Sequence, residues 1–302
     1  MLGVALVWYS LSKISVEELI TYFKNANYTY ICLGLFFGLL SHLSRAYRWK
    51  FMIEPLGYTL RFPNSIMAVF ATYLVNYTIP RAGEITRATI LTNYEGVPFE
   101  KGFGTIVAER IADLVVMLGI ITVTLFLEFD FIYQFFSERF DPYKIILGAV
   151  GLIVIGSLFF LFVKKSQSKI AVKVRSFVNG LVEGILSIFK MKNKWAFIFH
   201  TLFIWGMYIL MFYVTTWAIP ETSNLPLAAI LIGFISASFS IAATNGGIGS
   251  YPVAVYAAFS IFAIAKEPSI AFGWIMWSSQ TLMIIVLGGL SLIYLPIYNR
   301  IK

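Results

Sequence analysis

The stretch from Ser269 to Pro296, SIAFGWIMWSSQTLMIIVLGGLSLIYLP, decides the fold class, because none of its 28 residues is charged. A helix needs about 20 mainly apolar residues to cross the hydrocarbon core of a bilayer, so this stretch predicts a transmembrane helix. Four further runs meet the same length and a fifth comes close to it: 28–48, 104–127, 143–163, 195–217 and 226–244. The sequence therefore predicts an all-α, polytopic bundle of transmembrane helices.

The composition excludes a soluble enzyme of conventional build. Hydrophobic residues make up 59% of the 302 positions and charged residues only 13%, whereas roughly 25% of an ordinary soluble domain is charged. One soluble core could not bury this much apolar surface, so the surplus must face lipid. The longest polar stretch, 164–194, is too short for an appended catalytic domain. The single Cys32 permits neither a disulfide framework nor a thiolate zinc site.

The distribution of charge predicts the orientation. Residues 164–194 carry eight Lys or Arg and one acid, Glu183, which favours the cytoplasmic side. The short apolar runs 1–12 and 252–265 complete about eight membrane helices, while 65–79 is expected to enter and turn back, and re-entry of 252–265 is left open. Both termini are then cytoplasmic, in a bacterial-type cytoplasmic membrane, and the start is read as a retained segment without a cleavable signal.

The other connections follow by alternation. Residues 128–144 and 218–225 fall outside, whereas 45–64, 81–103 and the C-terminal tail fall inside. Within the single domain 1–302, the stretch 164–194 has a helical apolar stripe opposite its lysines: Ile170, Val174, Phe177, Leu181, Ile185 and Ile188. It is interpreted either as a basic amphipathic helix on anionic lipid or as a plain connection.

Four clusters of polar residues lie at the predicted membrane boundaries, where charges are expensive and often functional. In the first, Arg45 and Arg48 share one helix face at a spacing of three, beside Trp49. Snorkelling of both arginines to the interface is the alternative. In the second, Pro80 ends the short run 65–79. Gly83 is expected to permit a tight turn there, and the charged members are Arg81, Glu84 and Arg87.

The third cluster is Glu109, Arg110 and Asp113, expected in the first turns of a helix that starts near Gly104. Glu109 and Asp113 are four residues apart and repel each other, so they need cations opposite them. A structural ion-pair network is the alternative to a binding role. In low dielectric, the repulsion between these carboxylates is larger than in water.

The fourth cluster is a glycine-rich turn between two apolar runs. Its backbone N–H groups are expected to face an anionic ligand, and Ser250 is expected to cap the next helix. A glycine turn without a ligand is the alternative. The candidate residues are Asn245, Gly246, Gly247 and Gly249.

Taken in order, these motifs resemble those of the flippase-like membrane family that includes the membrane region of lysylphosphatidylglycerol synthases, the multiple peptide resistance factor type. The matching residues are Arg45-x-x-Arg48-Trp49, Pro80-Arg81-x-Gly83-Glu84-x-x-Arg87, Glu109-Arg110-x-x-Asp113 and Gly246-Gly247-Ile248-Gly249. Many members carry Glu shortly after the glycine motif, where this chain has Pro252. The resemblance implies the transport half of such synthases, without their aminoacyl-transfer domain.

The resemblance implies a flippase or transporter that moves a polar phospholipid, phospho- or aminoacylated, between leaflets. The substrate-binding residues would come from the four clusters, with no cofactor, metal or nucleic acid, and homo-oligomerisation is left open. The alternative is an intramembrane transferase that acts on a lipid-linked substrate, with Glu84, Glu109 and Asp113 as acid–base groups. The sequence has no recognisable nucleophile motif, which favours the transporter.

Overall fold

The computed structural model describes residues 2–139, 141–175 and 191–300, and within these ranges it contains helices and no strands. The chain forms two compact units. Unit 1 comprises Met1–Val107 and Lys192–Lys302, and unit 2 comprises Ala108–Met191. The prediction of an all-α, polytopic membrane fold is confirmed, and the prediction of a single domain stays a prediction.

Each apolar run that the sequence singled out contains a helix, although in the run 252–265 the helix ends at Ser260. Helices α6, α10 and α13 are long and apolar enough to cross a membrane, and α2 and α3 pass the same test as one pair bent by 83°. The helices over the predicted runs are α1 (Leu2–Leu11), α3 (Tyr28–Ile53), α4 (Phe62–Thr78), α6 (Phe99–Leu127), α8 (Pro142–Lys165), α10 (Lys194–Thr216), α11 (Leu227–Ala243), α12 (Ser250–Ser260) and α13 (Lys266–Arg300).

The structure adds helices outside the predicted apolar runs. They are α2 (Val16–Asn25), α5 (Ala82–Glu95), α7 (Phe129–Arg139) and the short 3-10 turns η1 (Glu54–Leu56) and η2 (Pro220–Thr222). A search for membrane-length runs passes over them. The start of helix α2 nevertheless has a recognisable sequence signal. Ser15 precedes the helix and accepts a hydrogen bond from the Glu18 backbone N–H at 3.1 Å. Ser followed by Glu three residues later is a capping-box pattern.

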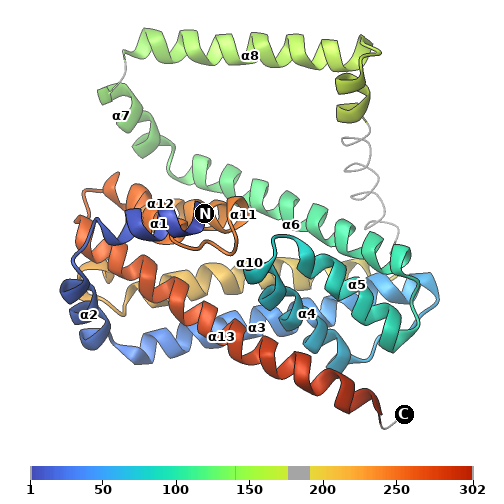
Figure 1. Cartoon of the computed structure of the whole chain (residues 1–302). Helices are drawn as coiled ribbons and strands as arrows, with labels where there is room; N and C mark the ends of the chain where they lie inside the picture. Colours follow the sequence, from blue (N-terminus) through green and yellow to red (C-terminus); the bar gives the residue numbers. More distant parts are fainter. Residues whose placement is uncertain (1, 140, 176–190, 301–302) are drawn as a thin grey trace. The chain divides into compact units, whose positions relative to one another are not determined.

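Helices α3 and α10 are the most extensively packed helix pair among the described residues of unit 1 and run antiparallel (Figure 1). Gly34 and Gly38, one turn apart on α3, face Thr215 and Met211 of α10 so closely that a Cβ on either glycine would overlap its neighbour. Small residues of this kind let two membrane helices approach and gain dispersion contacts, which lipid alone does not supply.

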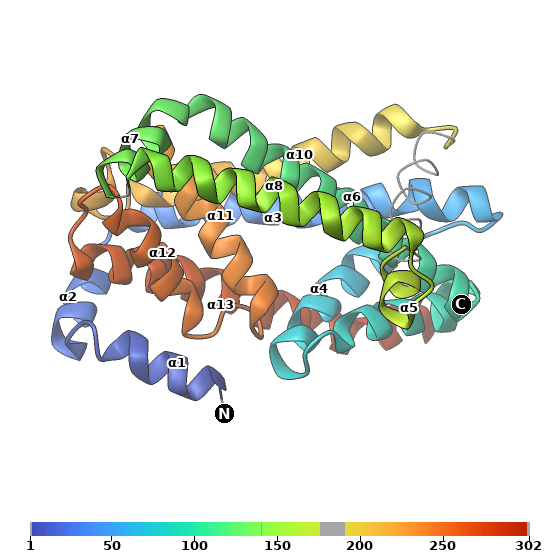
Figure 2. The same cartoon turned by 90° about the horizontal axis from the view of Figure 1, so that it is seen from above.

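Two helical hairpins are packed against α13 from opposite ends. Helix α4 has 17 residues, about 26 Å of helix, and therefore falls short of a bilayer core of ~30 Å before α5 folds back along it. Helices α11 and α12 make a second hairpin, which ends at the start of α13 (Figure 2). A re-entrant segment at 65–79 fits the first hairpin.

One end of unit 1 gathers segments that the charge count had placed on the same face. The Arg61 guanidinium donates to the Glu95 carboxylate at 3.0 Å and to the Asn299 side-chain oxygen at 2.8 Å. Asn64 and Asn299 also bond each other at 2.9 Å. This Arg61 network joins the start of α4, the end of α5 and the end of α13. It therefore holds together the two ends of the first hairpin that lie away from its turn.

We expect Arg61→Gln to destabilise the protein by about 1–3 kcal/mol, because the Glu95 carboxylate, only 6% exposed, loses its cationic donor. Thermal unfolding in detergent measures this. The exposed Lys169→Gln, with the same change of charge, is the matched control and should shift stability by less than about 0.5 kcal/mol. Equal melting of both variants would show that the network contributes nothing.

Unit 2 comprises α6 from Ala108 onward, α7 and α8. Many of its large apolar side chains are exposed, among them Phe126 at 80% and Phe160 at 64%, as expected of surfaces that face lipid. Helix α8 ends at Lys165, and Arg175 donates to the Ser166 carbonyl at 2.7 Å. Residues 176–190, which contain most of the predicted amphipathic stripe, lie outside the described residues.

Candidate functional site

Two arginines are buried beside an aromatic cluster in unit 1. Arg48 of α3 is 0% exposed, and its guanidinium donates to the Thr201 hydroxyl of α10 at 2.7 Å. The same guanidinium lies 5.1 Å from the centre of the Phe197 ring. A planar cation that keeps a hydrogen bond and a ring contact is held in one orientation.

Arg87 of α5 is 1% exposed and lies over the indole of Trp49, 3.9 Å from the ring centre. Trp49 is itself fully buried and donates its indole N–H to the Thr105 hydroxyl at 2.9 Å. The first and second sequence motifs thus meet at this indole. We call Arg48, Trp49 and Arg87 the arginine cluster.

The burial of the cluster bears on the snorkelling alternative for α3. Arg45 is 3% exposed and Arg48 and Trp49 are 0% exposed, so these side chains lie inside the packed helices. An arginine that snorkels would keep its guanidinium in water or among headgroups. The structure therefore favours a packed, functional or structural cluster over an interfacial anchor.

The α4–α5 turn uses its residues differently from the prediction. The left-handed residue is Arg81, with φ of 60°, which is exposed and precedes α5. Gly83 is helical and buried, and a Cβ there would overlap the Thr72 carbonyl of α4. The expected tight turn at Gly83 is therefore wrong, since this glycine allows close packing of α5 on α4. Glu84, half-buried, occupies the first turn of α5, where a carboxylate is favourable.

The glycine-rich turn meets the tip of the first hairpin. Gly246, Gly247 and Gly249 all have positive φ, and the Tyr77 ring near the end of α4 occupies the space where a Cβ of Gly246 would lie. Trp277 of α13 donates its indole N–H to the Gly246 carbonyl at 2.8 Å. The two hairpin tips, one from each end of unit 1, are thus in contact.

Two details of this turn correct the sequence analysis. Helix α12 is preceded by Gly249, without a side-chain cap, so Ser250 is not the expected N-cap. The Ser250 hydroxyl instead bonds the Thr244 hydroxyl at 2.9 Å and thereby closes the turn. Asn245 is half-buried, and its carbonyl accepts the Ile248 N–H, so this N–H is used within the turn.

The acidic motif belongs to unit 2. Helix α6 begins at Phe99, earlier than the predicted start near Gly104, so Glu109 lies in the third turn. Glu109 is 0% and Asp113 7% exposed, and both lie on one face, while Arg110 is half-buried. Each of these three residues has an interaction partner. Within the described ranges, His, Cys, Asp and Glu side chains do not gather in groups of three that could bind a metal.

Sequence reasoning missed the partners of the cluster. Thr201, Thr105 and Phe197 hold Arg48 and Trp49, and Tyr77 and Trp277 hold the glycine turn. Thr201 and Thr105 do stand out as polar residues within apolar runs, which is a usable signal. Which charge each one meets depends on how distant helices pack.

The family described as the lysylphosphatidylglycerol synthase TM region matches residues 1–289. The chain is 26% identical to the UPF0104 membrane protein MJ1595 of Methanocaldococcus jannaschii over 293 positions, which cover 86% of this chain and 82% of that protein. It is also 26% identical to the glycosyltransferase AglD of Haloferax volcanii over 113 positions, or 37% of this chain and 18% of that protein.

Proposed function

The chain belongs to the family of the lysylphosphatidylglycerol synthase transmembrane region, and we propose that it moves a polar phospholipid between the two leaflets of a membrane. The two helical hairpins carry this inference. Broken helices that meet from opposite ends of a bundle are the usual setting of a transporter's substrate site, since their free backbone groups face a cavity or a ligand.

The arginine cluster supports an anionic group on the transported lipid. Guanidinium groups bind phosphate through charge-assisted, often bidentate hydrogen bonds, and these are stronger where water is excluded. We assign Arg45, Arg48, Arg81 and Arg87, with the backbone of Asn245, Gly246, Gly247 and Gly249, to the phosphate. Gly83 brings α5 close enough to α4 to place Arg87. Glu84, in the first turn of α5, would hold these arginines or an amine on the headgroup.

The orientation follows from charge. The end of unit 1 that contains the Arg61 network, together with Lys50 and Arg300, is assigned to the cytoplasm, and the end that contains α2 to the opposite face. The basic stretch 164–194 would then lie against anionic lipid of the inner leaflet.

Reconstitution into proteoliposomes tests the proposed function. We expect a fluorescent phosphatidylglycerol in the inner leaflet to become accessible to an external quencher faster than in protein-free vesicles. Vesicles with an unrelated helical membrane protein control for leakage through disturbed lipid. Equal rates in all three preparations would overturn the proposal. A new lipid species on thin-layer chromatography, after incubation with labelled lipid-linked substrates, would instead support the transferase.

A further inference from the structure

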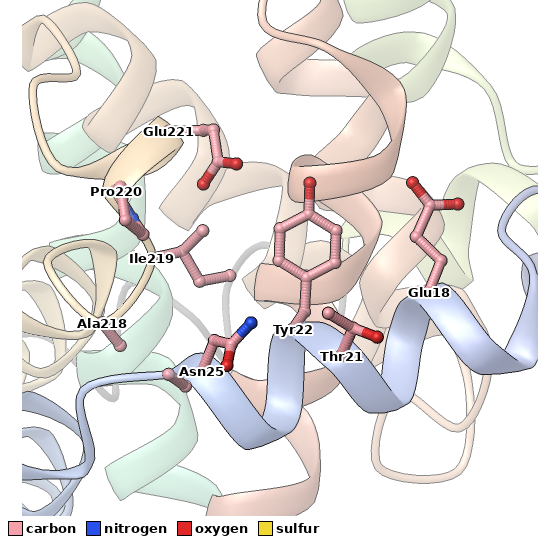
Figure 3. A pocket seen from close by; sticks show the side chains of 9 residues that line it. Glu18, Thr21, Tyr22, Asn25, Ala218, Ile219, Pro220 and Glu221 are labelled. Carbon is pink, nitrogen blue, oxygen red and sulfur yellow. The ribbon is translucent and has the colours of Figure 1, made fainter.

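Unit 1 has a pocket of about 370 Å³ between α2 and the residues that follow α10 (Figure 3). It lies at the end remote from the Arg61 network, where the Asn27 N–H bonds the Ala218 carbonyl at 2.9 Å. Its floor is apolar and buried, and its rim is polar. The floor and rim together comprise Glu18, Thr21, Tyr22, Asn25, Ala26, Ala218, Ile219, Pro220 and Glu221.

The charged groups of this pocket are both carboxylates. Glu18 comes from α2 and Glu221 from η2, and the Tyr22 ring stands between them (Figure 3). Among the residues that the structure describes, neither carboxylate forms an ion pair within 4.0 Å. A third acid whose charge reaches Tyr22 is Glu267 at the start of α13, but Glu267 forms an ion pair with Lys266 at 3.3 Å. The pocket therefore retains a negative charge.

The Tyr22 side chain contributes an aromatic ring to the pocket. Its phenol ring presents an electron-rich face to a cation. A cation between the two carboxylates would meet that ring as well as the charges.

The residues that line the pocket suit one class of cation better than another. A divalent metal prefers six or more oxygen ligands in a tight shell, whereas this pocket is wide and half apolar. An organic ammonium group matches both halves, because its N–H groups suit the carboxylates and the Asn25 amide while its carbon atoms cover Ala26 and Ile219. An anion would be repelled.

We propose that this pocket binds an organic ammonium group, carried either by a free amine or by a lipid headgroup at the membrane surface. The site does not depend on the transport role, because it shares no residue with the arginine cluster. Transport and ammonium binding can therefore fail separately.

Binding can be measured by saturation-transfer NMR on the protein in an amine-free, uncharged detergent, with ethanolammonium chloride as the probe. We expect the double variant Glu18→Gln, Glu221→Gln to weaken binding by about tenfold or more, since glutamine keeps the shape and removes the charge. Both positions are exposed, so folding should be retained. Glu17→Gln is the matched control, because Glu17 is an exposed acid of α2 outside the pocket.

A second arm identifies the source of the ammonium group. Nanodiscs with phosphatidylethanolamine or with phosphatidylglycerol alone compete against the soluble probe. Competition by phosphatidylethanolamine only would assign the site to a headgroup, and competition by neither to a free amine. Unchanged binding in the double variant, or an equal loss in Glu17→Gln, would overturn the proposal. An inactive protein in the leaflet assay that still binds the probe would contradict only the proposed transport.

Discussion

Arg87→Ala is expected to slow lipid movement in proteoliposomes by a factor of roughly 10 to 150, because a charge-assisted contact to a buried phosphate is worth about 1.5–3 kcal/mol. Arg87 is 1% exposed and lies over the Trp49 indole, so its contact with a phosphate would be made where water is excluded. Arg87→Lys retains the charge but loses the planar fork, and an intermediate rate is expected.

Two measurements separate a functional loss from a folding defect. The melting temperature and the gel-filtration profile of each variant report folding, and only variants that match the wild type enter the comparison of rates. Arg300→Ala, which removes an exposed arginine at the end of α13, is the matched control and should transport normally. Wild-type rates in a folded Arg87→Ala protein would rule out a role for this guanidinium in moving the lipid.

The fold could be predicted from apolar runs because lipid imposes a length on every crossing helix. The run 143–163 became α8, Pro142–Lys165, with ends close to those predicted. Helix α5 was missed because a polar helix that folds back on a partner needs no membrane-length run. Its close packing on α4 depends on Gly83 fitting against the Thr72 carbonyl, a contact between two helices that composition does not reveal.

The site could be predicted only as a set of charges. Buried arginines and acids are rare in membrane helices, so motif residues such as Arg48 and Arg87 stand out in the sequence alone. The arrangement of these residues cannot be predicted from the sequence, because the Trp49 indole that joins Arg87 to α3 could equally have been an interfacial anchor. Likewise, the contact of Tyr77 with Gly246 joins residues 169 positions apart. Only the packing of both hairpins on α13 brings them together.

Gly83→Ala is expected to destabilise the protein by about 3 kcal/mol or more, at the upper end for overpacking, because the added Cβ meets backbone. It would overlap the Thr72 carbonyl and lie 2.8 Å from the Asn76 side chain, whose oxygen accepts the Gly83 N–H at 2.9 Å. The α4–α5 hairpin must then open and shift Arg87. We expect a lower melting temperature together with a loss of lipid movement.

The matched control is not expected to lower the melting temperature. Gly119 is also a helical glycine, in α6, and a Cβ there would meet nothing within 4 Å. Because alanine favours a helix over glycine by about 1 kcal/mol, Gly119→Ala should leave the melting temperature unchanged or raise it. If both variants were equally stable, the close approach of α5 to α4 would not hold the hairpin.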